Sequence, residues 1–293
     1  MVRKIFFVIF VMSILYSCSS ENDNSNTTNK NNKSDTNNSN AILLDDYSKF
    51  ISGINTKTFA DIQDKNFYKN YSKSIKTTWN YFYLNQLLVI TKWARSHNLI
   101  SANDTASVFY PFSGPDFPFV YAFYPYAKNY LMIGLENIGV IPDIANYSDM
   151  EINNYINSIS SSLSYFFQKG YFSTEIMKNS FRNENMNGVI HPLLFFITRT
   201  GNKIENLQYF VLDNYGRIEY LNNLKRTEKR IKGVKLSFTG INGYKELFYL
   251  QVDLSDQNFI NHSELITFIS KFNEKDVFIK SASYLLQDDV FGF

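Results

Sequence analysis

The sequence predicts an α/β protein built on a mixed sheet, and three stretches carry that prediction. Residues 107–142 contain two apolar runs and a dense turn in the order strand, turn, helix, strand. Residues 67–96 show a helical spacing of apolar side chains, and β-prone runs separated by turns follow after residue 200. Helices that alternate with strands early in a chain, followed by antiparallel hairpins, indicate a mixed α/β sheet. We assign it to a single domain, residues 41–293.

The central unit begins with an apolar, aromatic run at residues 108–112. Ser113-Gly114-Pro115-Asp116 is a strong turn signal, and residues 117–127 are apolar enough for a short buried helix. A second apolar run, residues 130–135, stops at an acid, Glu136. A parallel strand pair joined by a helix is the simplest arrangement with this order.

A long helix is predicted from about Phe67 to Ser96. Its apolar residues recur at helical spacing: Phe67, Tyr71, Ile75, Trp79, Phe82, Leu87 and Ile90. We expect Trp93 and the other aromatic residues of this helix to belong to the core rather than to a ligand cage. The preceding segment, residues 41–66, opens on an apolar patch and then becomes mixed, so no element is predicted there.

Ser148 and Glu151 have the spacing of a capping box, which predicts a helix from there to about Gln168. A shorter helix is predicted after Ser173. Residues 189–198 are apolar and β-prone, and we interpret them as a strand.

The last third of the chain is predicted to be mainly antiparallel. The expected elements are a strand at 207–212, a turn at 214–216, a hairpin of 234–239 and 247–252 around Asn242-Gly243, a helix at 263–272 and a final strand at 277–286. The chain stops at Phe293, soon after that strand. Two interpretations stay open: a natural end on an edge strand, or a truncated form of a longer chain.

The N-terminus has the composition of an export signal. Arg3 and Lys4 precede a short apolar segment, residues 5–16, which is too short to span a bilayer as a stable helix. Leu15-Tyr16-Ser17-Cys18 then resembles the lipobox of bacterial lipoproteins. The resemblance implies removal of residues 1–17 and lipidation, palmitate included, at Cys18. Because Cys18 is the one cysteine in the chain, no internal disulfide is possible.

Residues 19–40 contain no apolar side chain. Such a segment has no surface to bury against its ordering entropy, so residues 18–40 are predicted to form a disordered tether that follows the lipidated cysteine. The lipid makes the membrane the first expected partner. We predict a cell-envelope location, at the outer membrane, on either its periplasmic face or the cell surface.

Charge excludes one class of function. The chain has 29 basic and 27 acidic residues, and Arg3 and Lys4 lie in the segment expected to be removed. The mature protein is therefore close to neutral, which argues against a general nucleic-acid binder.

Gly114 lies just after the first strand of the central unit, and Glu136 follows it by 22 residues at the end of the next strand. This layout resembles the first half of a Rossmann unit, and more distantly an S-adenosylmethionine-dependent methyltransferase. The resemblance implies cofactor contacts by Gly114, Asp116 and Glu136. Such sites use two or three glycines, whereas here a single glycine precedes Pro115, which has no N–H. We therefore expect no cofactor, no catalytic residue, and a structural turn beside a surface acid.

The segments FYPFSGPDF, FYPYA and IGLENIG also resemble a family of uncharacterised bacterial proteins that carry the same strand–turn–helix–strand signature. The resemblance spans about 35 residues. It implies that the central unit is real, and it transfers no catalytic residue.

Other patterns carry little chemistry. Tyr124 and Lys128 match the Tyr-x-x-x-Lys spacing of short-chain dehydrogenases but lack the glycine-rich turn those enzymes need. The three histidines, His97, His191 and His262, are far apart, so no zinc site is expected. Asp288-Asp289 lacks the further ligands of a calcium loop.

Lys225, Arg226, Lys229 and Arg230 form a basic cluster, which continues to Lys232 and Lys235. At helical spacing the first four share a face and would suit an anionic lipid or polysaccharide. The alternative is a solvated connection between two hairpins. The sequence as a whole predicts a lipid-anchored envelope protein with a non-catalytic binding or structural role. The alternative is a methyltransferase-like enzyme or a degenerate nucleotide-cofactor domain.

Overall fold

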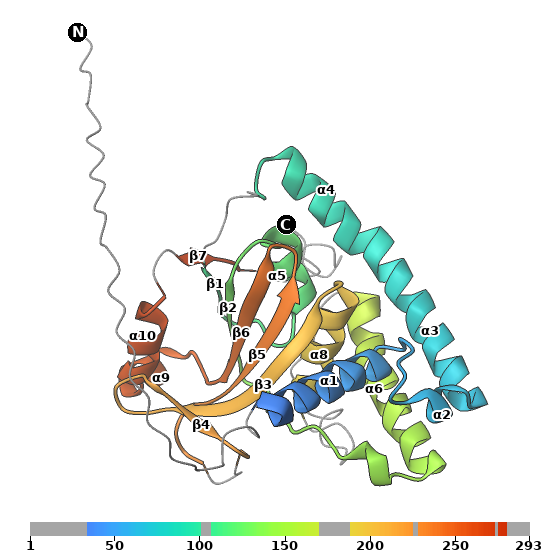
Figure 1. Cartoon of the computed structure of the whole chain (residues 1–293). Coiled ribbons are helices and arrows are strands. Elements are labelled where there is room, and N and C mark those ends of the chain that lie inside the picture. The colour runs from blue at the N-terminus through green and yellow to red at the C-terminus, as the bar shows by residue number, and fades with distance from the viewer. Residues whose placement is uncertain (1–33, 101–106, 170–187, 225–227, 273–274, 280–293) are drawn as a thin grey trace, which may run out of the picture.

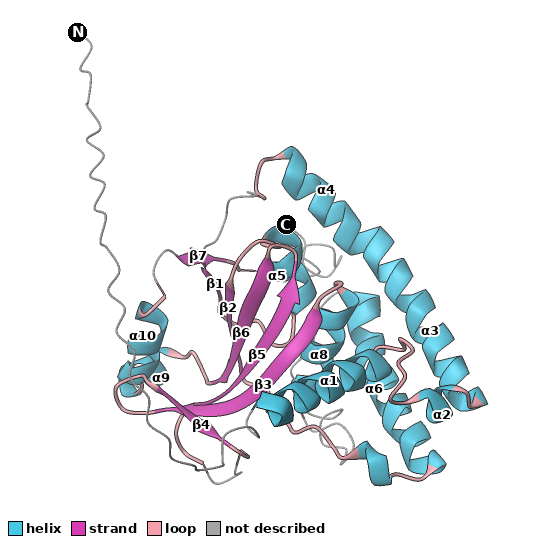
Figure 2. Ribbon diagram, viewed as in Figure 1, coloured by secondary structure: helices cyan, strands magenta, loops and turns pink. Residues whose placement is uncertain are grey.

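The computed structural model describes residues 34–100, 107–169, 188–224, 228–272 and 275–279, with side chains from residue 43 onward. Seven strands form one mixed sheet, and helices lie on both of its faces (Figures 1 and 2). The predicted fold class, α/β with a mixed sheet, is confirmed.

The sheet joins a parallel half to an antiparallel half. Its strands are β1 (Ser107–Tyr110), β2 (Asn129–Gly134), β3 (Lys203–Leu212), β4 (Ile218–Leu221), β5 (Lys232–Gly240), β6 (Gly243–Gln251) and β7 (Lys275–Val277). They lie in the order β4-β3-β5-β6-β2-β1-β7. Strands β6, β2, β1 and β7 are parallel neighbours, whereas β4, β3, β5 and β6 pair antiparallel.

Most helices lie on one side of the sheet. They are α1 (Ser34–Ile51), α2 (Ala60–Gln63), α3 (Asn66–Phe82), the π-helical turn η1 (Tyr83–Leu87), α4 (Leu88–Ser96), α5 (Phe117–Phe123), the 3₁₀ turn η2 (Ile144–Asn146), α6 (Asp149–Lys169) and α8 (Ile190–Arg199). Helices α9 (Asp256–Asn261) and α10 (Ser263–Ser270) lie on the other side (Figure 1). The predicted long helix is confirmed as the continuous run α3–η1–α4.

The central strands are apolar on both faces because each face has its own core. In β2, Tyr130 and Met132 point into a large core shared with the helices α1, α3, α5, α6 and α8. Leu131 and Ile133, between them in sequence, point to a smaller core closed by Leu265 and Phe268 of α10. Alternation of side chains across a strand explains how one continuous apolar run serves both cores.

The structure corrects the prediction for residues 189–198, which form helix α8 rather than a strand. All residues from Ile190 to Thr198 are buried. A short, mostly apolar run that is buried on every side fits a buried helix and a buried strand alike, and its β-prone residues favoured the strand. Pro192 is tolerated because it stands in the first turn, where its missing N–H has no helical partner to lose.

A second correction concerns the segment before Phe67. Helix α1 begins at Ser34, inside the segment predicted as a disordered tether, and continues through residues for which no element was predicted. Phe50 and Ile51 are fully buried at its C-terminal end. Packing of this end against the core nucleates the helix. Extending an existing helix by further polar residues then requires little additional free energy.

Several local predictions are confirmed. The capping box closes reciprocally: the backbone N–H of Ser148 donates to Glu151 Oε2 at 2.7 Å, and the N–H of Glu151 donates to Ser148 Oγ at 3.4 Å. Strands β5 and β6 form the hairpin expected around Asn242-Gly243. The strand predicted at 277–286 is not confirmed in that position: β7 spans Lys275–Val277 and pairs with β1, and residues 278 and 279 are not in a strand. Residues 280–286, and the helix predicted after Ser173, lie outside the described residues.

The two tryptophans stand on the same long helix in opposite environments. Trp79 is buried among the rings of Phe82, Phe167, Phe195 and Phe196. Trp93, which we expected in the core, is 51% exposed. The prediction failed for Trp93 because the long helix extends beyond the core that covers its first half (Figure 1).

Replacing Trp79 with Ala is expected to lower the free energy of unfolding by about 3–5 kcal/mol, because it opens a cavity in a closely packed aromatic cluster. Trp93→Ala is the matched control, and its loss should stay below about 1 kcal/mol. Urea unfolding of both variants measures the two values. Equal losses would contradict the arrangement of the long helix.

Candidate functional site

The predicted site residues Gly114, Asp116 and Glu136 all follow the carboxyl ends of parallel strands β1 and β2, and Gly114 and Glu136 both lie close to Gly134. Ligands bind at this carboxyl edge of the strands in open α/β sheets, so the geometry of these residues bears directly on whether a cofactor could bind here. The turn after β1 is fixed to the end of β2: Ser113 donates its N–H to the carbonyl of Ile133 at 2.7 Å and its hydroxyl to the same oxygen at 3.2 Å. The backbone N–H and the hydroxyl of Ser113 are therefore bonded within the protein and are not available to a ligand.

Gly114 has a φ of +50°, a conformation in which a Cβ is disfavoured. The residue two positions earlier, Phe112, also has a positive φ, +56°, and its side chain is 73% exposed. Two left-handed positions, separated by Ser113, reverse the chain abruptly after β1. Gly114 is therefore needed for the shape of the turn, whatever else it does.

Gly134, which the sequence analysis missed, lets the two halves of the edge approach each other. A Cβ at Gly134 would lie 2.5 Å from Glu136 Oε2, 2.6 Å from the hydroxyl oxygen of Tyr249 and 3.2 Å from the Cα of Gly114. No side chain fits at that position without displacing one of these groups. The sequence signal that could have identified Gly134 is its position at the end of a predicted strand, two residues before Glu136.

Glu136 is not the surface acid that we expected. Only 8% of the residue is exposed, and the hydroxyl of Tyr249 donates to its Oε2 at 3.1 Å and to its backbone oxygen at 3.2 Å. Burial, and then the charge of Glu136, raise the pKa of Tyr249 well above its usual range, so the phenol remains a donor. The prediction of a surface acid was wrong because β6 pairs with β2 and places Tyr249 beside Glu136, a contact that the sequence does not show.

Asp116 belongs to a second pair of the same kind. It is 6% exposed, and the hydroxyl of Tyr110 donates to its Oδ2 at 3.3 Å. Burial and the neighbouring carboxylate raise the pKa of Tyr110 above its usual range. Both acids of the edge are thus covered and bonded to tyrosines of the strands.

The loop after β2 closes the edge from another side. The carbonyls of Asn137 and Ile138 accept the N–H groups of Val189 and Ile190 at 2.8 and 3.0 Å. A Cβ at Gly188 would lie 2.3 Å from the backbone nitrogen of Gly139, so the two chain segments are in direct contact. The N–H groups at the start of α8, which would otherwise suit an anion, are therefore occupied.

The basic cluster lies in the connection between β4 and β5, so the alternative of a connection between two hairpins is the correct one. Its described residues are not helical. The shared helical face is thus wrong for Lys229 and Arg230; Lys225 and Arg226 lie outside the described residues. Arg230 donates to Glu219 at 2.6 Å and to Glu228 at 2.9 Å. Its hydrogen bonds lower the pKa of Glu228 to about 2.

Part of this cluster borders a cavity of about 310 Å³ at the ends of β2 and β6. The lining residues are Leu135, Glu228, Lys229, Arg230, Ile231, Lys232, Gln251, Val252, Asp253, Asn258 and His262. The structure therefore brings the basic cluster next to the carboxyl edge, although the two are about 100 residues apart in sequence. Glu228 and Asp253 in the lining, together with the ion pair between Arg230 and Glu219, offset much of the positive charge of the basic cluster.

The histidines are scattered, and within the described ranges no group of three or more His, Cys, Asp or Glu side chains could hold a metal ion. His191 lies fully buried in α8, where burial lowers its pKa to about 4. Cys18 and Asp288-Asp289 lie outside the described residues, and Tyr124 and Lys128 belong to the loop between α5 and β2. For the part of the chain with described structure, no helix is both long and apolar enough to cross a membrane.

Comparison with protein-family models, curated proteins and solved structures finds no match. The interpretation of the site therefore depends on its own geometry.

Tyr249→Phe is expected to lower the free energy of unfolding by about 1–3 kcal/mol, because it removes a hydrogen bond from a buried carboxylate. Tyr244→Phe on the same strand is the control, since Tyr244 is 55% exposed, and its cost should stay within about 0.5 kcal/mol. A double-mutant cycle with Glu136→Gln, read by urea unfolding, should show coupling above about 0.5 kcal/mol. Strictly additive effects would mean that the two side chains do not interact.

His191 is expected to make the protein acid-sensitive. Its pKa is about 4 when folded and about 6.5 when unfolded, so the unfolded state takes up its proton first. Stability due to neutral His191 is complete above pH 6.5 and falls between pH 6.5 and 4, by up to about 3 kcal/mol.

His191→Leu should remove that part of the pH dependence, measured as the difference in unfolding free energy between variant and wild type from pH 7 to pH 4. The control is His97→Gln, which changes an exposed histidine at the end of α4. A difference curve that stays flat for His191→Leu would contradict a neutral, buried imidazole.

Proposed function

We propose that this protein is a lipid-anchored component of the cell envelope whose α/β domain has a binding or structural role rather than a catalytic one. The anchor is supported by the leader: Arg3 and Lys4, a short apolar segment, and Leu15-Tyr16-Ser17-Cys18 in the order found in lipoproteins.

One observation carries the non-catalytic assignment. Glu136, the acid positioned to bind a ribose, is 8% exposed and accepts a hydrogen bond from Tyr249. A ribose-binding acid has to accept hydrogen bonds from two ligand hydroxyls, which requires an accessible carboxylate. The first backbone N–H of the neighbouring turn, that of Ser113, is likewise bonded to Ile133. The edge therefore functions as part of the fold.

The second candidate is a methyltransferase-like enzyme or a domain that retains a degenerate nucleotide site. A specific observation favours it over other enzymes: Gly114 and Glu136 lie together at the carboxyl edge of parallel strands β1 and β2. Calorimetric titration of the full chain with S-adenosylmethionine and with NAD separates the two candidates. We expect no binding of either; micromolar affinity that Glu136→Gln abolishes would favour the enzyme.

Changing Cys18 to Ala is expected to leave an uncleaved or mislocalised precursor, because the thiol that would carry the lipid is missing. Metabolic labelling with a fatty acid, followed by fractionation of membranes, measures the effect. Ser19→Ala, next to the cysteine, is the matched control and should still incorporate label. Label that persists in the Cys18→Ala variant would refute the anchor.

A further inference from the structure

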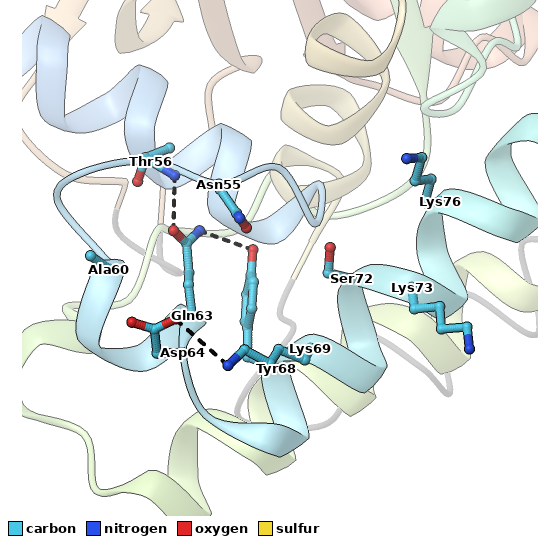
Figure 3. Close-up of a pocket in the computed structure, with 10 residues that line it drawn as sticks. All are labelled: Asn55, Thr56, Ala60, Gln63, Asp64, Tyr68, Lys69, Ser72, Lys73 and Lys76. Atoms are coloured by element: carbon cyan, nitrogen blue, oxygen red, sulfur yellow. Dashed lines mark hydrogen bonds and ion pairs between the residues drawn. The ribbon is translucent and has the colours of Figure 1, made fainter.

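A second cavity is lined by the α1–α2 loop, α2 and the first part of α3. These elements lie on the helical side of the domain (Figure 1). The cavity has a volume of about 430 Å³ and opens between the α1–α2 loop, α2 and α3 (Figure 3). Its lining residues are Asn55, Thr56, Ala60, Gln63, Asp64, Tyr68, Lys69, Ser72, Lys73 and Lys76. This volume is in the range of natural small-molecule sites, and nine of the ten lining residues carry a polar side-chain group.

The wall of the cavity is held in place by Gln63, which is buried. Its Oε1 accepts the N–H of Thr56 at 2.8 Å, and its Nε2 donates to the carbonyl of Ile54 at 3.1 Å and to the hydroxyl oxygen of Tyr68 at 3.2 Å. Tyr68 in turn donates to the carbonyl of Phe50 at 2.8 Å. These bonds fix the α1–α2 loop against α2 and α3 (Figure 3), so the cavity is preorganised.

A further bond closes the back of the cavity, where Ser72 Oγ donates to the carbonyl of Gly53 at 2.7 Å. Close packing there depends on Gly53, whose added Cβ would lie 3.1 Å from the Cα of Ser72. Thr56 leaves one group open: its Oγ1 is buried and has no hydrogen-bond partner among the described residues. This oxygen is enclosed and does not face the cavity, so it contributes no ligand contact.

Positive charge follows one side of the cavity. Lys69, Lys73 and Lys76 are spaced by four and three residues and therefore lie along one side of α3. Lys69 Nζ is 3.6 Å from Asp64 Oδ1, and both residues line the cavity (Figure 3). Lys73 and Lys76 form no ion pair with a described residue, so three lysines and one aspartate leave an excess of positive charge.

We propose that this cavity binds a small hydroxyl-bearing anion of sugar size, a sugar acid or a sugar phosphate. The amide of Asn55 provides a donor and an acceptor for sugar hydroxyls, and Lys73 and Lys76 provide the countercharge. The inference deepens the binding role proposed above and gives it a ligand class.

The test is calorimetric titration of the full chain, in detergent, with glucuronate, glucose 6-phosphate, glucose and inorganic phosphate. At least one of the two sugar anions should bind with a dissociation constant of about 1 mM or tighter. Glucose and inorganic phosphate should each bind at least about tenfold more weakly than that ligand, because each supplies half of the required contacts. The two sugar anions distinguish a carboxylate from a phosphate as the charged group.

The double variant Lys73→Gln/Lys76→Gln should weaken binding of the sugar anion about tenfold, because two charge contacts are lost. Lys92→Gln/Lys128→Gln is the charge-matched control: it removes two exposed lysines outside the cavity and should leave the affinity unchanged. Asn55→Ala should weaken binding of the sugar anion while leaving inorganic phosphate unaffected. Thermal unfolding of each variant verifies that the domain is intact.

Three outcomes would overturn the proposal: no detectable binding of either sugar anion, equal loss of affinity in the two lysine double variants, or inorganic phosphate binding as tightly as the sugar anion. Each of these results leaves the lipid anchor untouched, because that part of the proposed function is read from labelling at Cys18. Conversely, a wild-type protein that incorporates no fatty-acid label but binds the sugar anion would refute the lipid anchor and leave the cavity proposal intact.

Discussion

Burial of the parallel strands on both faces is the constraint on which the rest of the structure depends. In β2 and β6 consecutive apolar side chains alternate between two cores, so each face of the sheet needs its own helical cover. Helix α8 fills the larger core with residues that are buried on every side, and α10 closes the smaller one. The hydrophobic effect over these faces is the main driving force, since no disulfide can contribute in a chain with a single cysteine.

The same constraint shapes the carboxyl edge. Once the strand ends are buried, Asp116 and Glu136 cannot stay unbonded, because an unpaired buried carboxylate is very costly. Tyr110 and Tyr249 supply the donors from within the strands. An edge that satisfies its own acids offers a ligand little. Of the two cavities, one lies beside this edge, between the ends of β2 and β6 and the β4–β5 connection, and the other lies between the α1–α2 loop, α2 and α3.

Prediction succeeded where the signal was local. The capping box at Ser148 and Glu151, the hairpin at Asn242-Gly243 and the strand–turn–helix–strand unit each depend on residues within a few positions of one another. It failed for α8 because a short apolar run fits a buried helix and a buried strand alike. Glu136 and Trp93 were misjudged for a different reason: their exposure is set by partners, or by missing partners, far away in sequence.

The sequence by itself determined the α/β class, the parallel unit at residues 107–134 and the antiparallel hairpins, because side-chain period, turn residues and caps act over short distances. Its leader pattern also carries the export and lipidation hypothesis. Only the tertiary structure decided which acids are buried, that Tyr249 meets Glu136, and that the α1–α2 loop and α3 enclose a lysine-lined cavity. Those features join segments tens to more than a hundred residues apart. Their free energy depends on packing between elements, which no local pattern encodes.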